Sequence, residues 1–275
     1  MAELLNEYSR RLYGEDEVTA AEVGHWWGDP EIEAWVDDGA YADLGVRAEG
    51  ARLWIDLRGA PSTDLLEVVE RRAREIAAPS ALLRAVVASP DEGLRRLFDD
   101  AGYRYVRSSY TMRIELGEEP EPPAWPEGIV ARTGRADDAE AVHAAHMDSF
   151  ADHWDFHPDP FESWRHWLLE GERGDPALWL LAYDGADLAG ICLAAPHQSG
   201  DPRAGWIEIL GVRPPWRGRG LGLALLRGSF RELFRRGRRV VELGVDAEST
   251  TGAVRLYERA AMHMSRRRDT LEKQL

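Results

Sequence analysis

The chain has 275 residues, more than an ordinary domain of about 150, so its length predicts two compact units. Hydrophobic residues make up 44%, enough to build buried cores. The formal net charge of −15 disfavours nucleic acid as a partner, because phosphates would be repelled over most of the surface. Cys192 is the only cysteine, which excludes an intramolecular disulfide and a cysteine metal cluster. The N-terminus does not resemble a signal peptide and no apolar run approaches about 18 residues, so we expect a cytoplasmic protein without a membrane span.

The first half of the chain predicts an incomplete unit. Residues 16–43 are acidic and rich in tryptophan, and they leave little room for N-terminal helices. Residues 52–57 predict a strand and residues 65–77 a helix. Residues 117–126 are acidic and proline-rich, so they can hold neither a helix nor an interior strand. We therefore predict a first domain over residues 1–117, a linker over 118–126 and a second domain over 127–275.

The second half predicts a complete α+β unit. Its expected elements are, in chain order, a strand at 128–133, helices at 136–149 and 160–169, a hairpin at 178–195 that turns at Asp184 and Gly185, a strand from Trp206, a helix from Gly220 to Gly237, and a strand at 240–245. In the helix that starts at Gly220, Leu226, Phe230, Leu233 and Phe234 share one face, so this helix should pack against the sheet.

A strand, a glycine- and arginine-rich turn and a helix follow one another over residues 206–226. The backbone N–H groups of residues 217–222 should lack partners there, and the helix N-terminus adds partial positive charge, so the turn predicts a phosphate site. Pro214 and Pro215 cannot pair in a sheet, so the strand must end or splay at Val212 and leave a free edge. A dinucleotide fingerprint would need glycine where Leu223 or Leu225 stands, and a P-loop would need lysine after Gly222.

The turn does match R-x-x-G-x-G, from Arg217 to Gly222, and the block Thr250-Thr-Gly-Ala-Val-Arg-Leu-Tyr-Glu-Arg-Ala-Ala-Met262 follows it. Together they resemble the acyl-CoA site and a later helix of the GCN5-related N-acetyltransferase (GNAT) superfamily, and the whole chain resembles tandem-GNAT acetyltransferases of the mycothiol synthase type. The resemblance implies acetyl-CoA as cosubstrate and no metal. It assigns donor binding to Leu210, Gly211, Val212, Arg217, Gly218, Arg219, Gly220, Leu221, Gly222, Thr250 and Ala253. Thr250 replaces the asparagine that is usual in the family, and Ala261-Met262 replaces Gly-Phe.

The two halves also resemble each other at an offset of 159 residues. Residues 97–103 align with residues 256–262, which places Phe98 opposite Tyr257. Residues 58–64 lack the Gly-x-Gly turn. We therefore expect an α+β fold of two GNAT-type domains, each with a mixed, mostly antiparallel sheet flanked by helices, of which the first is truncated and degenerate.

Two residues are candidates for the chemistry of acetyl transfer. Glu208, between Ile207 and Ile209, is the candidate base, acting directly or through a water, if burial in the cleft raises its pKa; the alternative is the solvent side of an alternating strand. Tyr257 matches the family tyrosine that protonates the departing thiolate, and its alternative is a core aromatic.

The acceptor site is expected in residues 150–157. Asp152, His153, Trp154 and Asp155 could receive an amine through charge and cation–π contact, although packing of the aromatic side chains between the domains is the alternative. The histidines of this region lack a ligand signature, so no metal site is predicted.

The predicted function is acetyl-CoA-dependent transfer of an acetyl group to a primary amine of a small molecule or peptide. Two alternatives are a CoA-binding sensor or scaffold without turnover and an aminoglycoside-type acetyltransferase. We expect neither nucleic acid nor membrane as a partner, and the sequence leaves open whether the protein forms a homodimer.

Overall fold

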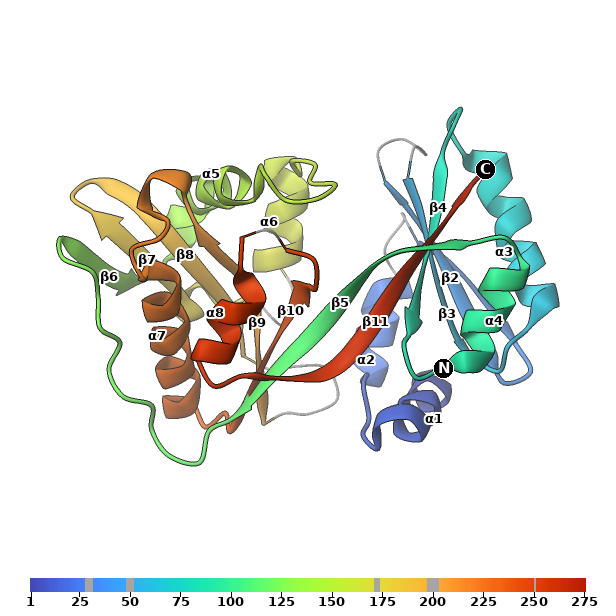
Figure 1. Ribbon diagram of the computed structural model, residues 1–275, viewed down its shortest axis with the longest axis horizontal. Helices are drawn as coiled ribbons and strands as arrows, with labels where there is room; N and C mark the ends of the chain where they lie inside the picture. The colour runs from blue at the N-terminus through green and yellow to red at the C-terminus, as the bar shows by residue number, and fades with distance from the viewer. Residues whose placement is uncertain (28–31, 48–51, 171–173, 197–202, 250) are drawn as a thin grey trace. The chain divides into compact units, whose positions relative to one another are not determined.

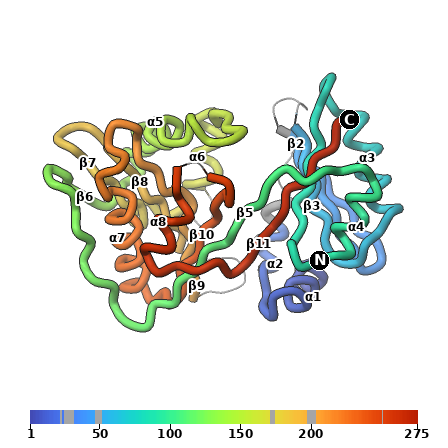
Figure 2. Tube along the Cα trace, viewed as in Figure 1, coloured from blue at the N-terminus to red at the C-terminus, as the bar shows by residue number. Residues whose placement is uncertain are grey.

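The computed structural model describes residues 1–27, 32–47, 52–170, 174–196, 203–249 and 251–275, and these form two compact units. Unit 1 contains Met1–Tyr110, Asp246–Glu248 and Arg266–Leu275, whereas unit 2 contains Thr111–Val245 and Ser249–Ser265. The last ten residues therefore belong with the first unit, which differs from the predicted second domain of 127–275. They do so because β11 (His263–Gln274) runs antiparallel to β4 (Leu82–Ala88), from Arg268 opposite Ala88 to Gln274 opposite Leu82 (Figures 1 and 2).

Unit 1 has the strand order β1-β2-β3-β4-β11 and contains N-terminal elements that the sequence analysis did not predict. Beyond β4 and β11, its elements are α1 (Ala2–Tyr13), α2 (Ala20–Trp27), β1 (Ile32–Asp37), β2 (Ala40–Arg47), β3 (Arg52–Gly59), α3 (Thr63–Ile76), α4 (Glu92–Asp100) and the first part of β5 (Arg104–Glu115). Leu53, Ile55 and Leu57 alternate along β3 and pack with Leu65 and Val69 of α3 in the core. The alternate residues of β3 therefore face the other side of the sheet.

Unit 2 has the strand order β10-β9-β8-β7-β6 with the end of β5 beside β10. Its elements are β6 (Ile129–Thr133), α5 (Ala139–Phe150), α6 (Phe161–Leu169), β7 (Trp179–Asp184), β8 (Asp187–Ala195), β9 (Ala204–Val212), α7 (Leu221–Arg235), β10 (Val240–Asp246), α8 (Ala253–Arg259) and short 3₁₀ turns at Ala136–Asp138, Pro176–Leu178 and Pro214–Trp216. The hairpin between β7 and β8 turns at Gly185, as expected.

Helices α5 and α7 cover opposite faces of the unit 2 sheet. A Cβ on Gly190 would touch Leu221 and Leu225 of α7, whereas one on Gly211 would touch Ser149 of α5. Cys192 is fully buried under α7, where it accepts a hydrogen bond from Ser229, and burial raises the pKa of its thiol to about 12. Cys192 is therefore a core residue of β8.

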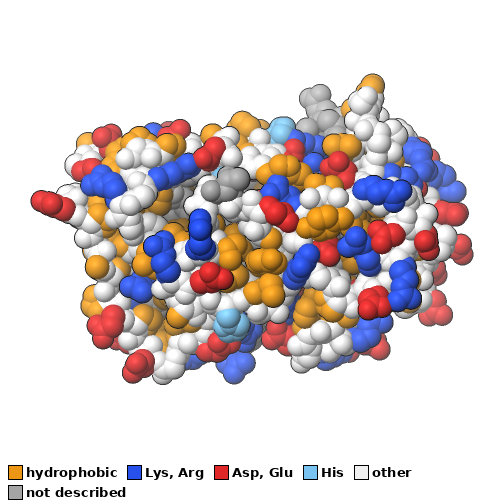
Figure 3. All heavy atoms as spheres, viewed as in Figure 1, with side chains coloured by type: hydrophobic (Ala, Val, Ile, Leu, Met, Phe, Trp, Pro, Cys, Tyr) orange, Lys and Arg blue, Asp and Glu red, His pale blue; other side chains and the backbone are white. Residues whose placement is uncertain are grey.

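The proline-rich segment 118–126 belongs to unit 2 and lies along α7. Glu119 forms ion pairs with Arg231 at 2.8 Å and Arg235 at 2.9 Å, and the Pro120 carbonyl accepts a hydrogen bond from Arg231. The predicted linker is therefore anchored along the outer side of a helix. Acidic and basic side chains are interspersed on the face of the molecule seen in Figure 3, and none of the described helices is long and apolar enough to cross a membrane.

Candidate functional site

Glu208 lies at an irregularity in β9. Leu193 of β8 pairs with Ile209, but the next residue, Ala194, pairs with Ile207, so Glu208 is skipped in the ladder. Such bulges redirect side chains and are common beside active sites. The Glu208 side chain is exposed, so the predicted burial is wrong. Its carboxylate accepts a hydrogen bond from the Trp206 indole at 2.9 Å, a contact between residues two apart that the sequence analysis missed.

The bulge coincides with the separation of β9 from its other neighbour. The parallel pairing of β9 with β10 ends at Ile207 opposite Leu243, although both strands continue. On its other edge β9 stays paired with β8 as far as Val212. Residues 208–212 therefore have one edge that no described strand occupies. The free edge predicted from Pro214 and Pro215 starts earlier, because pairing is lost at the bulge rather than at the prolines.

The turn after β9 presents backbone donors. Gly218 and Gly220 have φ of 75° and 85°, in the left-handed region that glycine adopts readily, and Gly220 is the N-cap of α7. No described acceptor bonds the backbone N–H groups of residues 218–223. The N–H groups of residues 217–222 were expected to lack partners, and this is wrong for Arg217, whose N–H donates a hydrogen bond of 3.3 Å to the Pro214 carbonyl. An ideal Cβ on Gly218 or Gly220 would meet nothing within 4 Å, so there is open space beside these donors.

The equivalent helix of unit 1 starts differently. In α3 the Ser62 hydroxyl caps the helix by accepting from the Leu65 N–H at 3.2 Å. In α7 no side chain takes this role. The N–H groups at the start of α7 are therefore available to an anion. At the start of α3, by contrast, one N–H group is already bonded to the Ser62 hydroxyl.

Arg217 is held by the protein itself. Its guanidinium forms two hydrogen bonds to the Asp152 carboxylate, of 2.5 and 3.0 Å, and others to the carbonyls of Val212 and Ser149. The hydrogen bond from Arg217 lowers the pKa of Asp152. Arg217 thus connects the turn of residues 217–222 to the end of α5. Asp152 was expected in the acceptor site, but its carboxylate pairs with this turn instead. The second arginine, Arg219, is more exposed and lies 3.5 Å from Asp184, a contact that the sequence analysis missed.

Ser149 is a further residue that sequence reasoning missed. Its hydroxyl is buried, has no hydrogen-bond partner among the described residues, and belongs to the side chain that a Cβ on Gly211 would touch. Leu210, Leu221 and Gly222, which were also predicted to bind the acetyl donor, lie on β9 and in the first turn of α7. A Cβ on Gly222 would be 2.9 Å from Leu256, so this glycine allows α7 and α8 to pack closely.

Tyr257 lies on α8 and is only 8% exposed. Burial, followed by the nearby Cys192, raises the pKa of its phenol above the usual value, so the hydroxyl keeps its proton at neutral pH. The aligned residue of unit 1, Phe98, is fully buried and carries no hydroxyl. The sequence analysis left open a core aromatic, and the burial of Tyr257 is compatible with both roles.

The start and the end of α8 differ in what they show. Thr250 lies outside the described residues, and the N-cap is Gly252, so Ala253 is the first helical residue. Ala261, which replaces the glycine usual in the family, has φ of 65°. The local backbone therefore keeps the left-handed conformation although the side chain does not favour it.

The segment after α5 presents an exposed aromatic side chain. Trp154 is 44% exposed, His153 packs on Phe150 with ring centroids 4.3 Å apart, and Asp155 has φ of 55°. His146 is partly buried and accepts a hydrogen bond from the Trp164 indole. Its burial, followed by the charges of His143 and His153, lowers its pKa to about 4. The described residues contain no group of three or more His, Cys, Asp or Glu side chains that could hold a metal ion.

The sequence of the chain is similar to those of known acetyltransferases. The sequence profile of the Acetyltransferase (GNAT) family matches residues 139–262. Mycothiol acetyltransferase of Salinispora arenicola is 34% identical over 228 residues, which cover 80% of this chain and 72% of that protein. Mycothiol acetyltransferase of Geodermatophilus obscurus is 39% identical over 175 residues, which cover 61% of this chain and 56% of that protein.

Solved structures of GNAT proteins superimpose on nearly the whole chain. A GCN5-related N-acetyltransferase from Sphaerobacter thermophilus superimposes with a TM-score of 0.81 at 34% identity, covering 99% of this chain and 91% of that one. A tandem GNAT protein from the clavulanic acid biosynthesis pathway superimposes with a TM-score of 0.72 at 15% identity, covering 99% and 93%, and shows the shared fold alone.

Proposed function

The chain belongs to the GNAT family of N-acetyltransferases, and from that premise we propose that it moves an acetyl group from acetyl-CoA to the amine of a small molecule or peptide. The observation that carries the proposal is the free edge of β9 leading into the unbonded N–H groups of residues 218–223. An extended pantetheine arm suits the strand edge, and a pyrophosphate suits the helix N-terminus.

We assign proton transfer to Glu208 and Tyr257. Glu208 takes a proton from the acceptor ammonium, directly or through a water, and the freed amine nitrogen forms a bond to the thioester carbon. The carbon–sulfur bond then breaks, and the Tyr257 hydroxyl donates its proton to the departing thiolate. The nitrogen loses its second proton as the amide forms, and this proton returns through solvent to the Tyr257 phenolate, which restores the hydroxyl. Trp206 is a positioning residue, because its indole holds the Glu208 carboxylate. We assign the binding of acetyl-CoA to the residues of β9, the turn and the start of α8 that the sequence analysis named.

The proposed acceptor rests on the names of the relatives and on the exposed segment after α5. Relatives are named as mycothiol acetyltransferases, so mycothiol lacking its acetyl group is the first acceptor to test. His153, Trp154 and Asp155 are proposed to line the acceptor site, where Trp154 offers an exposed aromatic face to a cation. Asp152 acts at this site only through its pair with Arg217.

The test measures thiol release from acetyl-CoA across a panel of amines that includes deacetylated mycothiol, an aminoglycoside and a short peptide. We expect Glu208→Gln and Tyr257→Phe each to lower kcat about 100-fold, the typical contribution of one acid or base. Matched controls are Glu140→Gln, at an exposed site of α5, and Tyr183→Phe, both in unit 2. Tight CoA binding without turnover on any amine would favour a sensor, and turnover on the aminoglycoside alone would favour the antibiotic-modifying alternative.

A further inference from the structure

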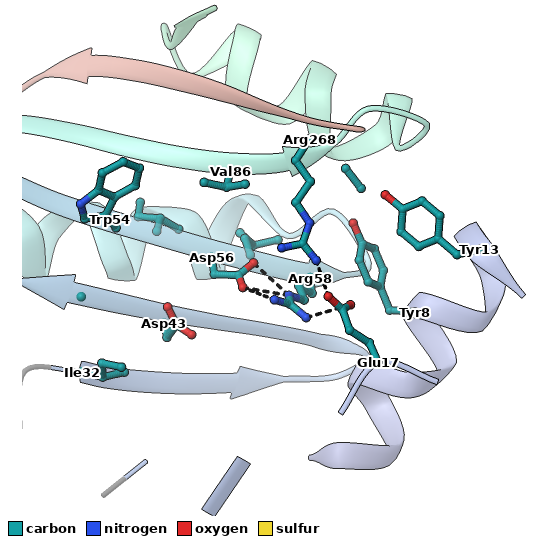
Figure 4. Close-up of a pocket in the computed structure, with 14 residues that line it drawn as sticks. Tyr8, Tyr13, Glu17, Ile32, Asp43, Trp54, Asp56, Arg58, Val86 and Arg268 are labelled. Atoms are coloured by element: carbon teal, nitrogen blue, oxygen red, sulfur yellow. Dashed lines mark hydrogen bonds and ion pairs between the residues drawn. The ribbon is translucent and has the colours of Figure 1, made fainter. Parts of the chain in front are cut away.

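Unit 1 contains a cavity of about 400 Å³, and all the described residues that line it belong to this unit. It lies on the face of the sheet opposite α3, where Asp43 and Gly45 of β2 and Asp56 and Arg58 of β3 form its floor. Figure 4 shows Asp43, Asp56 and Arg58 among the residues of the cavity. Pockets for small molecules typically measure about 300–1,000 Å³. The cavity is thus large enough for a small ligand and belongs to the unit that lacks the Gly-x-Gly turn.

Two arginines of the cavity are already neutralised by carboxylates. Arg58 binds Asp56 through two nitrogens and Glu17 at 3.2 Å, and Arg268 also binds Glu17 (Figure 4). Burial by itself would raise the pKa of Glu17, but Arg58, Arg268 and Arg266 lower it to about 2. These arginines therefore leave little positive charge for an anionic ligand.

Asp43 is different, because no described residue forms an ion pair with it. Its carboxylate accepts a hydrogen bond of 2.6 Å from the Tyr41 hydroxyl, and it lies directly opposite Asp56 in the β2–β3 register. Like charges in this arrangement destabilise a sheet. Burial, followed by the charge of Asp56, raises the pKa of Asp43 to about 7. When Asp43 is ionised, the floor of the cavity carries one negative charge that the described residues do not balance.

The space above this carboxylate is open. Gly45 is on the same side of β2 as Asp43, and an ideal Cβ there would meet nothing within 4 Å. Tyr8 and Trp54 give the cavity aromatic walls. The buried Tyr13 hydroxyl has no hydrogen-bond partner among the described residues and points toward Tyr8 and Arg268 (Figure 4). The cavity therefore offers an acidic floor, aromatic walls and a free hydroxyl.

We propose that this cavity binds a small organic cation, a primary amine with an apolar or aromatic body, whose charge pairs with Asp43. The site is additional to the acetyl-transfer residues, because Glu208 and Tyr257 belong to unit 2. A protonated amine supplies the positive charge that Asp43 lacks, and its body fills the space over Gly45 against Trp54.

Three probes of one shape test the charge requirement on the full-length protein: benzylamine, benzyl alcohol and benzoate. Calorimetric titration should detect benzylamine, and the neutral and anionic probes should bind at least about tenfold more weakly, as expected for loss of a charge-assisted hydrogen bond. Equal binding of the three probes, or no binding of benzylamine, would overturn the proposal.

Matched variants locate the site. Asp43→Asn should weaken benzylamine at least about tenfold, whereas Asp38→Asn, in the exposed turn before β2, should leave it unchanged. Gly45→Val should also abolish binding by filling the space while every charge stays in place. Glu208→Gln should have no effect, and weakening by this variant alone would assign the amine to the acetyl-transfer site instead. Circular dichroism confirms that each variant is folded.

The pH dependence provides an independent measurement. Benzylamine stays protonated between pH 6 and pH 8, while Asp43, with a pKa of about 7, loses its proton in that interval. Affinity should therefore rise with pH in the wild type and stay level in Asp43→Asn. The charged groups that act on Asp43 are Asp56 and Arg58, which form an ion pair with each other, and Arg58 stays protonated throughout this interval. Glu17, in the same cavity, titrates far below the interval. A flat wild-type profile would show that Asp43 does not bind the amine.

Discussion

Ala261 carries a conformational cost that its own side chain causes. Its φ of 65° is left-handed, it is exposed, and its N–H bonds the Glu258 carbonyl in the turn after α8. The left-handed conformation of an L-residue destabilises the folded protein by about 1–2 kcal/mol. Glycine would remove this strain, but its larger conformational entropy in the unfolded chain would offset part of the gain. The turn nevertheless forms, because Met262 behind it is buried and bonds the Tyr257 carbonyl.

We expect Ala261→Gly to stabilise the protein by about 0.5–1 kcal/mol, the difference between these two contributions. The measurement is the denaturant midpoint at constant m-value. Ala186→Gly, in the turn between β7 and β8, is the control and should not stabilise, because the φ of Ala186 is not positive. A lower midpoint for Ala261→Gly would show that left-handed strain at this residue is negligible.

At the scale of elements, helix α7 has glycines with the same φ at its two ends. Gly220 precedes its first turn and Gly237 follows its last, both with φ of 85° and no neighbour within 4 Å of an ideal Cβ. The two residues therefore carry the same strain penalty on substitution but lie at opposite poles of the helix dipole.

Gly220→Ala and Gly237→Ala should lose similar stability, about 1–2 kcal/mol each. Only Gly220→Ala should raise KM for acetyl-CoA, by about tenfold, because it alters the unbonded N–H groups proposed to hold the pyrophosphate. Steady-state kinetics with varied acetyl-CoA measures the difference. If both variants raise KM alike, the N-terminus of α7 has no special part in donor binding.

At the scale of the whole molecule, the two units exchange strands. The first part of β5 lies in unit 1 and its end in unit 2, while β11 starts in unit 2 and ends in unit 1. Leu271 of β11 is fully buried in the core of unit 1, whereas Met264 of the same strand is 52% exposed. The folding of unit 1 thus depends on the last residues of the chain.

Leu271→Ala should destabilise unit 1 by about 2–5 kcal/mol, the usual cost of a cavity in a core. Hydrogen exchange followed by mass spectrometry should show faster exchange in β3 and β4. Met264→Ala is the control on the same strand and should leave exchange in both strands unchanged. Faster exchange confined to unit 2 would contradict the assignment of 266–275 to unit 1.

Patterns of neighbouring residues were enough to predict much of the structure from the sequence by itself. The glycine and arginine turn, the apolar strands and the Asp-Gly hairpin are short-range patterns, and together with the repeat at an offset of 159 residues they predicted the α+β fold and the family. That Tyr257 supplies the acid, and that the first half with Phe98 lacks it, stays a prediction.

Tertiary structure alone decided the features that join distant residues. Arg217 forms hydrogen bonds with Asp152, which lies 65 positions earlier, and β11 pairs with β4. Asp43 lies opposite Asp56 on the neighbouring strand. The bulge at Glu208 likewise depends on the register between β8 and β9 rather than on β9 alone. Each depends on strand pairing or on packing between elements, which the composition of a single segment does not encode. The sequence therefore predicted the family and the strand, turn and helix over residues 206–226, while the fold determined which charged side chains form ion pairs.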